Sequence, residues 1–183
     1  MPAVVVQPYS ADWPRQFDAV RDELRGVFAF VEVAIEHIGS TSVPELAAKP
    51  VIDVLVGAAS LAYIEDRIAS LAALGYEYVA KYEVELPLRR YFVKSSMLSP
   101  RIHVHAVVTG STIWREHLAF RDALRTNAAL RSEYQELKVQ LAARFVDNKA
   151  AYTEAKDPFI KAALRTSIDS LSNSMVDSTE LAT

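Results

Sequence analysis

Residues 51–56 read VIDVLV, and this apolar run with a single charge limits the possible folds more than any other part of the chain. A continuous aliphatic run of this length is typical of a central strand that is covered on both faces. Along such a strand Val51, Asp53 and Leu55 share one face. A buried carboxylate at Asp53 must be compensated by a metal, a cation or hydrogen-bond donors. We therefore interpret Asp53 as a site residue. The alternative is a structural carboxylate that pairs with a Lys or Arg or accepts hydrogen bonds from loop N–H groups.

The loop before this strand is rich in small and hydroxyl-bearing residues, namely Gly39, Ser40, Thr41 and Ser42. Such a turn presents backbone N–H groups and hydroxyl groups to an anion. Lys49 precedes a proline, so its backbone is expected to be extended and its side chain can reach toward a bound phosphate or toward Asp53. The loop and the strand together predict a phosphate and metal site.

The spacing of apolar residues predicts the other elements. A helix begins near Asp12, with Pro14 in its first turn, and a half-buried strand follows at residues 31–38. Ser60 can cap a second helix, which Gly75 ends. Further strands are predicted at residues 76–81, 88–93 and 101–108, and helices from residue 112 onward. This order indicates an α+β fold, in which a mixed sheet packs against helices and the C-terminal part adds a helical layer.

Length and composition indicate a single domain over residues 1–166 that includes the C-terminal helices. Residues 167–183 are rich in serine and contain no aromatic residue. A segment of this composition cannot bury enough apolar surface to order itself. We therefore expect residues 167–183 to form a flexible tail.

Charge and composition exclude several classes of function. The net charge of −3 argues against binding nucleic acid through bulk charge, so the expected partner is a small phosphate-containing molecule. The absence of cysteine excludes disulfides, thiolate metal sites and cysteine nucleophiles. The N-terminus lacks the features of a signal peptide, and no stretch has the length needed to span a bilayer. A cytoplasmic protein without membrane contact is the expectation.

Two histidines stand on the strand predicted at residues 101–108. Alternation places His103 and His105 on one face together with Arg101. A His-x-His pair on a strand can offer two metal ligands, and imidazole suits Zn, Mn, Ni or Fe better than Mg. The alternative is a pair of half-buried histidines held by backbone carbonyl groups.

Arginines provide candidate phosphate ligands on two further elements. Arg89 and Arg90 point to opposite faces of a predicted strand, so one of them can share a cleft with Asp53. A charged, solvated strand edge is the alternative. The helix predicted after residue 112 carries its apolar residues on one side. Three polar residues at spacings of four lie on that same side, namely His117, Arg121 and Arg125. We expect Arg121 to line the cleft and Arg125 to form a structural ion pair.

The segment EHIGSTSVPELAAKPVIDVLV, followed by RRYF, HVHAVV, REHLAFRDALR and YTEAKDPFI, resembles the GrpB family of small bacterial proteins over about residues 4–165. The family typically has VPGL where this chain has Val43-Pro44-Glu45-Leu46, so Glu45 replaces a glycine. GrpB-like domains are similar to the polymerase β-type nucleotidyltransferase superfamily. They also occur fused to dephospho-coenzyme A kinases.

This resemblance implies a site with a Gly-Ser turn, a strand with two carboxylates two positions apart, and a third carboxylate on a later strand. Gly39-Ser40 match the turn and Asp53 matches the first carboxylate. Leu55 occupies the place of the second carboxylate, and the later strand offers His103 and His105 in place of an acid. Superfamily enzymes use these acids to hold two Mg²⁺ ions, so the ordinary reaction is in question.

Three functions remain open from the sequence. The first is a divergent nucleotidyltransferase, in which Ser40 and Ser42 hold phosphate, Asp53 binds a divalent metal (Mg, Mn or Zn) with His103 or His105, and arginines neutralise the nucleotide. The arginines of this hypothesis are Arg89 or Arg90 together with Arg121. The second is a nucleotide- or coenzyme A-binding module without catalysis. The third is a metal-assisted hydrolase in which Asp53, His103 and His105 hold one metal ion.

Overall fold

The computed structural model describes residues 5–29, 31–96 and 100–166. By their contacts these residues form two compact units, one over Gln7–Leu118 and one that comprises the helices from Ala119 onward together with the start of the chain. The domain expected over residues 1–166 therefore contains two such units. The tail expected at residues 167–183 lies outside the described residues.

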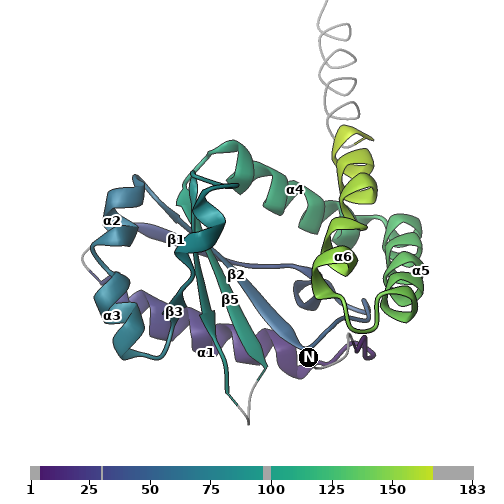
Figure 1. The fold of residues 1–183 in the computed structure, drawn as a ribbon, viewed down its shortest axis with the longest axis horizontal. Helices are drawn as coiled ribbons and strands as arrows, with labels where there is room; N and C mark the ends of the chain where they lie inside the picture. The colour runs from purple at the N-terminus through teal and green to yellow at the C-terminus, as the bar shows by residue number, and fades with distance from the viewer. Residues whose placement is uncertain (1–4, 30, 97–99, 167–183) are drawn as a thin grey trace, which may run out of the picture. The chain divides into compact units, whose positions relative to one another are not determined.

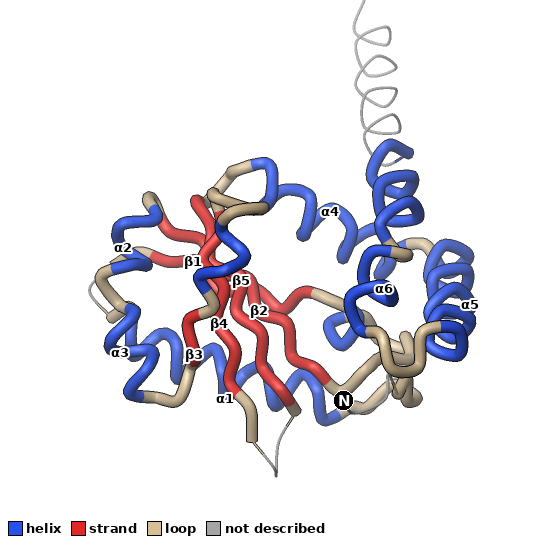
Figure 2. Tube along the Cα trace, viewed as in Figure 1, coloured by secondary structure: helices blue, strands red, loops and turns tan. Residues whose placement is uncertain are grey.

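A five-stranded mixed sheet forms the centre of the first unit (Figures 1 and 2). The strands follow the order β1 (Val33–Ile38), β2 (Val51–Ala58), β5 (Arg101–Val108), β4 (Arg89–Lys94) and β3 (Glu77–Tyr78). β2 and β5 run parallel, whereas the other neighbouring pairs are antiparallel. The predicted central strand is β2, and its apolar run is explained by its position between β1 and β5.

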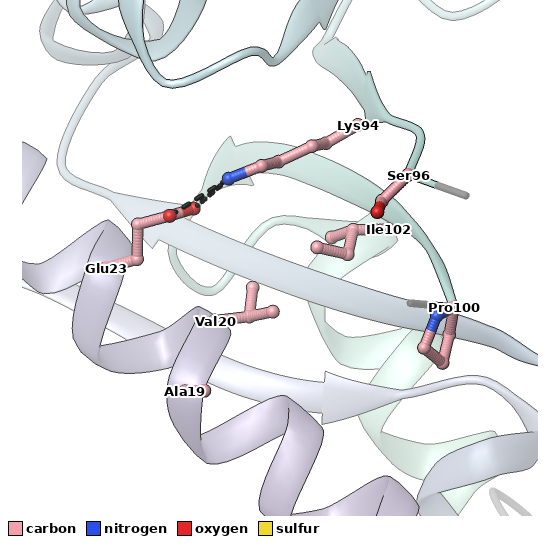
Figure 3. Close-up of a pocket in the computed structure, with 7 residues that line it drawn as sticks. All are labelled: Ala19, Val20, Glu23, Lys94, Ser96, Pro100 and Ile102. Carbon is pink, nitrogen blue, oxygen red and sulfur yellow. Dashed lines mark hydrogen bonds and ion pairs between the residues drawn. The ribbon is translucent and has the colours of Figure 1, made fainter. Parts of the chain in front are cut away.

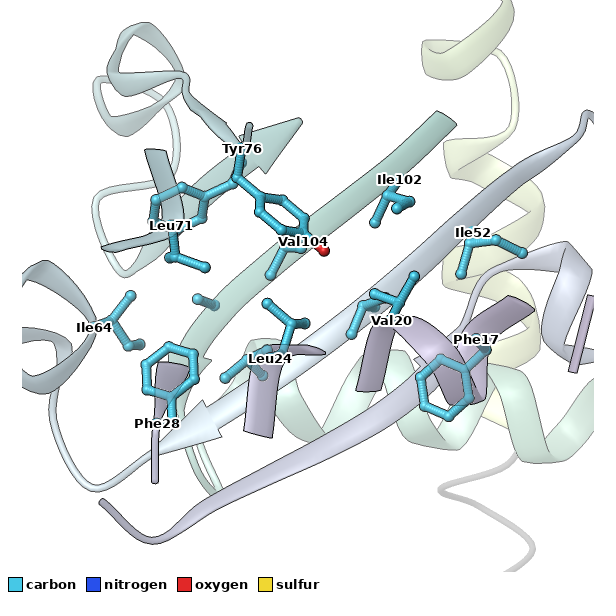
Figure 4. Close-up of a cluster of buried hydrophobic side chains, with 14 of the residues drawn as sticks. Phe17, Val20, Leu24, Phe28, Ile52, Ile64, Leu71, Tyr76, Ile102 and Val104 are labelled. Carbon is cyan, nitrogen blue, oxygen red and sulfur yellow. The ribbon is translucent and has the colours of Figure 1, made fainter. Parts of the chain in front are cut away.

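One face of the sheet carries the main core, shown in Figure 4. Helix α1 (Asp12–Val27) buries Trp13, Phe17, Val20 and Leu24 against this face. The strands contribute alternate residues, including Ile52, Val54, Ile102 and Val104. The residues between these, such as Asp53 of β2 and His103 of β5, therefore lie on the opposite face of the sheet.

Two predicted elements differ in the structure. The helix expected after Ser60 is divided into α2 (Leu61–Glu65) and α3 (Ile68–Ala73), because the Arg67 N–H bonds to the Ile64 carbonyl and closes a tight turn between them. Both short helices still bury one apolar residue, Ile64 or Leu71. In the described chain Ser60 occupies the N-cap without a capping bond from its side chain, whereas Gly75 adopts the expected left-handed conformation (φ 87°).

The strand expected at residues 76–81 shortens to β3, and the 3₁₀ turn η2 (Ala80–Glu83) follows it. β3 lies at the edge of the sheet and has one neighbouring strand, so fewer ladder hydrogen bonds hold it. The Tyr78 hydroxyl donates to Glu83, which joins the strand to the returning turn.

The C-terminal part of the chain is helical, as predicted. Its helices are α4 (Thr112–Thr126), α5 (Ala128–Arg144) and α6 (Lys149–Glu154), and residues 157–166 are helical as well. α4 crosses the boundary between the two units. In the second unit Tyr134 contacts the rings of Phe120 and Phe159, each with a centroid separation of 5.2 Å. No helix among the described residues is long and apolar enough to cross a membrane.

Candidate functional site

The face of the sheet opposite the main core brings the predicted acidic and histidine residues together. β2 and β5 pair in register with Asp53 beside His103 and Leu55 beside His105. On the other side of β5, Tyr91 of β4 stands beside His105. His103 and His105 thus share one face, as alternation predicts, and the strand pairing places Asp53 on the same face.

Asp53 contacts both histidines through one carboxylate oxygen. Its Oδ1 lies 3.3 Å from Nδ1 of His103 and 3.8 Å from Nε2 of His105, and the Asp53 side chain is 25% exposed. Burial by itself would raise the pKa of Asp53. Hydrogen bonding and charge interaction with the two histidines outweigh that effect and hold this pKa well below its usual range. Asp53 is therefore a carboxylate near neutral pH, and it accepts hydrogen bonds without donating any.

His105 is held from both sides. Nη1 of Arg89 lies 3.3 Å from Nδ1 of His105. A guanidinium group only donates hydrogen bonds, so Nδ1 of His105 must accept, and the ring proton of neutral His105 lies on Nε2, facing Asp53. Burial lowers the pKa of His105 in spite of the Asp53 charge, which agrees with a neutral ring. Arg89 thus donates to His105, whose Nε2 faces the Asp53 carboxylate at 3.8 Å.

Two further side chains close around this chain of contacts. Tyr91 packs against the rings of His103 and His105 with centroid separations of 5.6 and 5.1 Å. Burial and the Asp53 charge raise the pKa of Tyr91, so its hydroxyl keeps its proton. The ring of His117, on the first part of α4, lies 5.4 Å from that of His105. Burial, which disfavours the charged imidazolium, lowers the pKa of His117 to about 4. Neither Tyr91 nor His117 was a candidate site residue from the sequence, although His117 belongs to the polar stripe of its helix.

The Gly-Ser-Thr-Ser loop packs directly onto Asp53. Gly39 adopts φ 69° and ψ −177°, and a Cβ at this position would overlap Oδ2 of Asp53. The Thr41 hydroxyl donates to the Val51 carbonyl at 2.8 Å and contacts Nε2 of His37, and the Ser42 hydroxyl donates to the Gly39 carbonyl at 2.7 Å. The Thr41 hydroxyl therefore holds the loop against β2, and the Ser42 hydroxyl closes the turn within the loop. A phosphate-binding role for Gly39, Ser40, Thr41 and Ser42 stays a prediction.

Glu45, which replaces the glycine of the family pattern, takes up the backbone conformation that a glycine would favour. Its φ is 66°, in the left-handed region, and its side chain is exposed. A left-handed conformation costs an L-residue about 1–2 kcal/mol. A glycine at this position would avoid that cost, but it would lose more conformational freedom on folding, so the net gain in stability is smaller. The loop therefore keeps its shape at the expense of local strain.

Replacing Glu45 by Gly is expected to stabilise the domain by up to about 1 kcal/mol, because the strain at this position is relieved. The free energy of unfolding in urea measures the effect. Glu45→Ala is the matched control, because alanine removes the carboxylate and keeps the Cβ. An equal gain from Glu45→Ala would contradict the conformational explanation.

The other predicted phosphate ligands are distributed over different places. Arg90 lies on the opposite face from Arg89, where its guanidinium pairs with Glu65 at 2.6 Å and with Glu83 at 3.3 Å. Of the two arginines, Arg89 therefore shares the face with Asp53, as alternation required of one of them. Lys49 is partly buried, and its role stays a prediction. Arg121 belongs to the second unit and pairs with Asp122 at 2.7 Å, so its place in a cleft also stays a prediction.

The residues on this face do not fit a pair of magnesium ions. Leu55, where a second carboxylate would stand, is fully buried in an apolar cluster with Ile38 and Val107, against which Trp114 and Leu118 pack. Two magnesium ions require several oxygen ligands, and Asp53 supplies the one carboxylate of the cluster described above. Among the described residues, no group of three or more His, Asp or Glu side chains is arranged to hold a metal ion. A metal role for Asp53, His103 and His105 stays a prediction.

A separate pocket lies on the core side of the sheet, between α1 and the ends of β4 and β5 (Figure 3). Its polar side chains are joined to one another: Nζ of Lys94 contacts both carboxylate oxygens of Glu23 at 2.8 and 2.9 Å. The Tyr76 hydroxyl donates to the same carboxylate at 2.6 Å. Burial opposes the charge on Glu23, but these hydrogen bonds outweigh it and lower the pKa of Glu23. The pocket therefore holds a structural ion pair, and it is distinct from the Asp53 cluster.

Glu23→Gln is expected to destabilise the domain by about 1–3 kcal/mol at neutral pH, because Lys94 loses its counter-ion. The lowered pKa of Glu23 means that the carboxylate stabilises the fold above its usual pKa of 4.5 and that this contribution is lost as the pH falls through the folded value. Urea unfolding from neutral to acidic pH measures both effects. The difference between the two proteins should shrink on acidification, and a constant difference would contradict this assignment.

Comparison with known proteins gives a consistent group of relatives. A family model described as GrpB protein matches residues 3–166. The chain is 39% identical over 155 residues to the UPF0157 protein YqkA of Bacillus subtilis. This match covers 85% of this chain and 44% of that protein. It is 31% identical over 161 residues to the glutamate-rich protein GrpB of Alkalihalophilus pseudofirmus, with coverage of 86% and 91%. A dephospho-CoA kinase of Mycolicibacterium paratuberculosis is 27% identical over 184 residues, and the match spans 88% of this chain and 45% of the kinase.

Solved structures support the same grouping. The crystal structure of the conserved protein GrpB from Enterococcus faecalis is similar with a TM-score of 0.81 and 36% identity, covering 91% of this chain and 99% of that chain. The Cid1 poly(U) polymerase with MgGTP bound reaches a TM-score of 0.51 at 12% identity, covering 76% of this chain and 45% of the polymerase. The second similarity concerns the fold. The expected α+β, nucleotidyltransferase-like architecture is thereby confirmed.

Proposed function

The chain belongs to the GrpB family, and on that premise we propose that it binds the phosphate groups of a nucleotide-like ligand at the face of the sheet that carries Asp53. The observation that carries the proposal is the state of Arg89. Its Nε is buried and has no hydrogen-bond partner among the described residues, while Nη1 of the same group donates to His105. A buried guanidinium N–H without an acceptor is costly, and a phosphate oxygen is an acceptor that suits the geometry of a guanidinium group.

The face that carries Arg89 holds both arginines and carboxylates. Arg101 stands on the same face of β5 and is exposed. His105 and His117 are neutral near pH 7, because burial lowers the pKa of each ring. Asp53 is the carboxylate at the centre of the cluster, and His103 contacts it directly. Glu36 of β1, which pairs with Leu55, is a second carboxylate on this face, so two arginines meet two carboxylates. The buried Nε of Arg89, and not a surplus of positive charge, is therefore the feature that favours a phosphate group.

Binding without two-magnesium chemistry follows from the residues that are present. The buried Leu55 removes the second acid of the superfamily pattern, whereas Arg89 supplies a fixed positive charge that needs no metal. A guanidinium group can hold phosphate oxygens in a bidentate geometry. We therefore favour a nucleotide- or coenzyme A-binding domain over an ordinary nucleotidyltransferase. The similarity to a dephospho-CoA kinase is the reason to include coenzyme A.

Titration calorimetry with ATP and with coenzyme A, each in EDTA, tests the proposal. At least one of these ligands should bind saturably, and Arg89→Met should weaken its binding by about tenfold or more. Arg25→Met is the matched control, because Arg25 is an exposed arginine on α1, the helix that covers the opposite face of the sheet. Absence of binding by both ligands, or equal losses from the two substitutions, would overturn the proposal.

Metal-dependent nucleotidyl transfer and metal-assisted hydrolysis are the competing functions. The first is favoured by the Gly-Ser loop, since Gly39 packs directly onto the first carboxylate of the superfamily pattern. Pyrophosphate release from a nucleoside triphosphate with Mg²⁺ or Mn²⁺, abolished by Asp53→Ala, would support transfer over binding. A transition metal that copurifies with the protein, detected by elemental analysis, would support the hydrolase.

A further inference from the structure

The four ring nitrogens of His103 and His105 are not equivalent. Both nitrogens of His105 are engaged, Nδ1 by Arg89 and Nε2 by Asp53. His103 uses Nδ1 for Asp53, and Tyr91 packs against its ring at an interplanar angle of 68°. Its Nε2 has no hydrogen-bond partner among the described residues. This atom is also absent from the set of fully buried polar atoms without a partner, which contains Gln16 Oε1 and Arg89 Nε. This nitrogen is the one position of the pair that can meet a ligand.

The contact with Asp53 also decides where the proton of His103 lies. An ionised carboxylate repels a ring lone pair and attracts a donor, so the 3.3 Å contact favours the tautomer of His103 with the proton on Nδ1. The lone pair of the neutral ring is then on Nε2, at the end of the ring away from Asp53. A carboxylate behind an imidazole in this way fixes the tautomer and stabilises the imidazolium that forms when the ring takes up a second proton.

We propose that His103 is the general base of a metal-independent reaction at phosphorus, in which Asp53 is the positioning residue. This inference rests on the proposed phosphate ligand. A water or hydroxyl oxygen attacks a phosphoester or phosphoanhydride phosphorus while Nε2 of His103 takes the proton of that oxygen. The new O–P bond forms, the bond from phosphorus to the leaving oxygen breaks, and the leaving oxygen keeps the electron pair. The proton on Nε2 afterwards passes to the leaving group or to water, which restores the neutral ring.

The surrounding groups suit this reaction. Arg89, which lies beside His105, can neutralise charge that develops on the phosphate oxygens. His105 donates toward the same carboxylate oxygen that His103 contacts, so it helps to keep Asp53 in place. Tyr91 contacts both rings and restricts their rotation. A metal ion is not required in any of these roles.

The tautomers are the first test, because they can be measured without a substrate. In long-range proton–nitrogen spectra of ¹⁵N-labelled protein, neutral His103 should carry its proton on Nδ1 and neutral His105 on Nε2. His103→Gln and His105→Gln identify the two sets of signals. A proton on Nε2 of neutral His103 would overturn the proposal.

The second test uses the p-nitrophenyl ester of thymidine 5′-phosphate in EDTA, since its good leaving group needs no acid. The wild type should release p-nitrophenolate, and His103→Asn should lower the rate about a hundredfold or more. Asparagine can still donate to Asp53 from the position of Nδ1, so this variant removes the base and keeps the contact. Added imidazole should restore part of the activity of His103→Ala, which a purely structural role would not allow.

Binding measured in parallel separates this inference from the proposed function. Saturable binding of ATP or coenzyme A with no release of p-nitrophenolate by the wild type would overturn the role of His103 and leave the binding function in place. Equal rates for the wild type and His103→Asn would overturn it as well. Absence of both binding and release would overturn both proposals. The expected result is saturable binding and release of p-nitrophenolate by the wild type, with the release lost on His103→Asn.

Discussion

Leu55→Asp, which restores the second acid of the superfamily pattern, is expected to unfold the domain instead of creating a magnesium site. Leu55 is fully buried between Ile38 and Val107, with Trp114 packed over the cluster. A carboxylate there would lose its hydration, and its neighbour His105 already contacts Arg89 and Asp53. Glu36 of β1, which stands opposite in the strand pairing, would repel it. The expected loss is about 4 kcal/mol or more, which exceeds the effect of most single substitutions.

Urea unfolding followed by circular dichroism measures this loss, with and without millimolar Mg²⁺. Leu55→Met is the matched control, because it keeps an apolar side chain of similar volume and should cost less than about 1.5 kcal/mol. A folded Leu55→Asp protein that Mg²⁺ stabilises would contradict the prediction. It would also show that the histidine-containing cluster can still accept the metal chemistry of the superfamily.

The central part of the fold could be predicted from the sequence because its patterns are local. The apolar run of β2 and the alternation in β5 each specify a strand and its faces without reference to the rest of the chain. His103 and His105 could therefore be assigned to one face of their strand, and Asp53 to one face of its own strand together with Leu55. Their actual contacts could not be predicted, since those depend on the parallel pairing of Asp53 with His103.

The parts that could not be predicted depend on contacts between distant segments. Alternation indicated that one of Arg89 and Arg90 would share the face with Asp53. The choice of Arg89 follows from the pairing of β4 with β5, in which Arg89 stands beside Val107. His117 reaches the site because the first part of α4 packs over Leu55 and Val107, and the sequence of that helix does not reveal this contact. β3 shortened because it lies at the edge of the sheet, which is likewise a property of the assembled sheet.

Gly39→Ala is expected to destabilise the domain by about 2–5 kcal/mol, through two separable causes. The backbone conformation of φ 69° and ψ −177° is essentially restricted to glycine, which accounts for about 1–3 kcal/mol. The added Cβ would also overlap Oδ2 of Asp53 and lie 2.9 Å from its Cβ, which forces the carboxylate away from the histidines. Chemical denaturation gives the total loss, and ring signals of His103 report the displacement of its partner.

A double-mutant cycle with Asp53→Ala separates the two causes of the Gly39→Ala loss. Alanine at position 53 removes the overlapping carboxylate, so Gly39→Ala should cost about 1 kcal/mol less in that background than in the wild type. The relief is partial, because the backbone strain and the Cβ contact at 2.9 Å remain. Asp53→Asn is the matched control, since it keeps the size of the side chain and should give no relief. If the cost of Gly39→Ala fell equally in the Asp53→Ala and Asp53→Asn proteins, the charge of Asp53 would be the cause. The close packing of Gly39 against the carboxylate would then not determine the conformation of this loop.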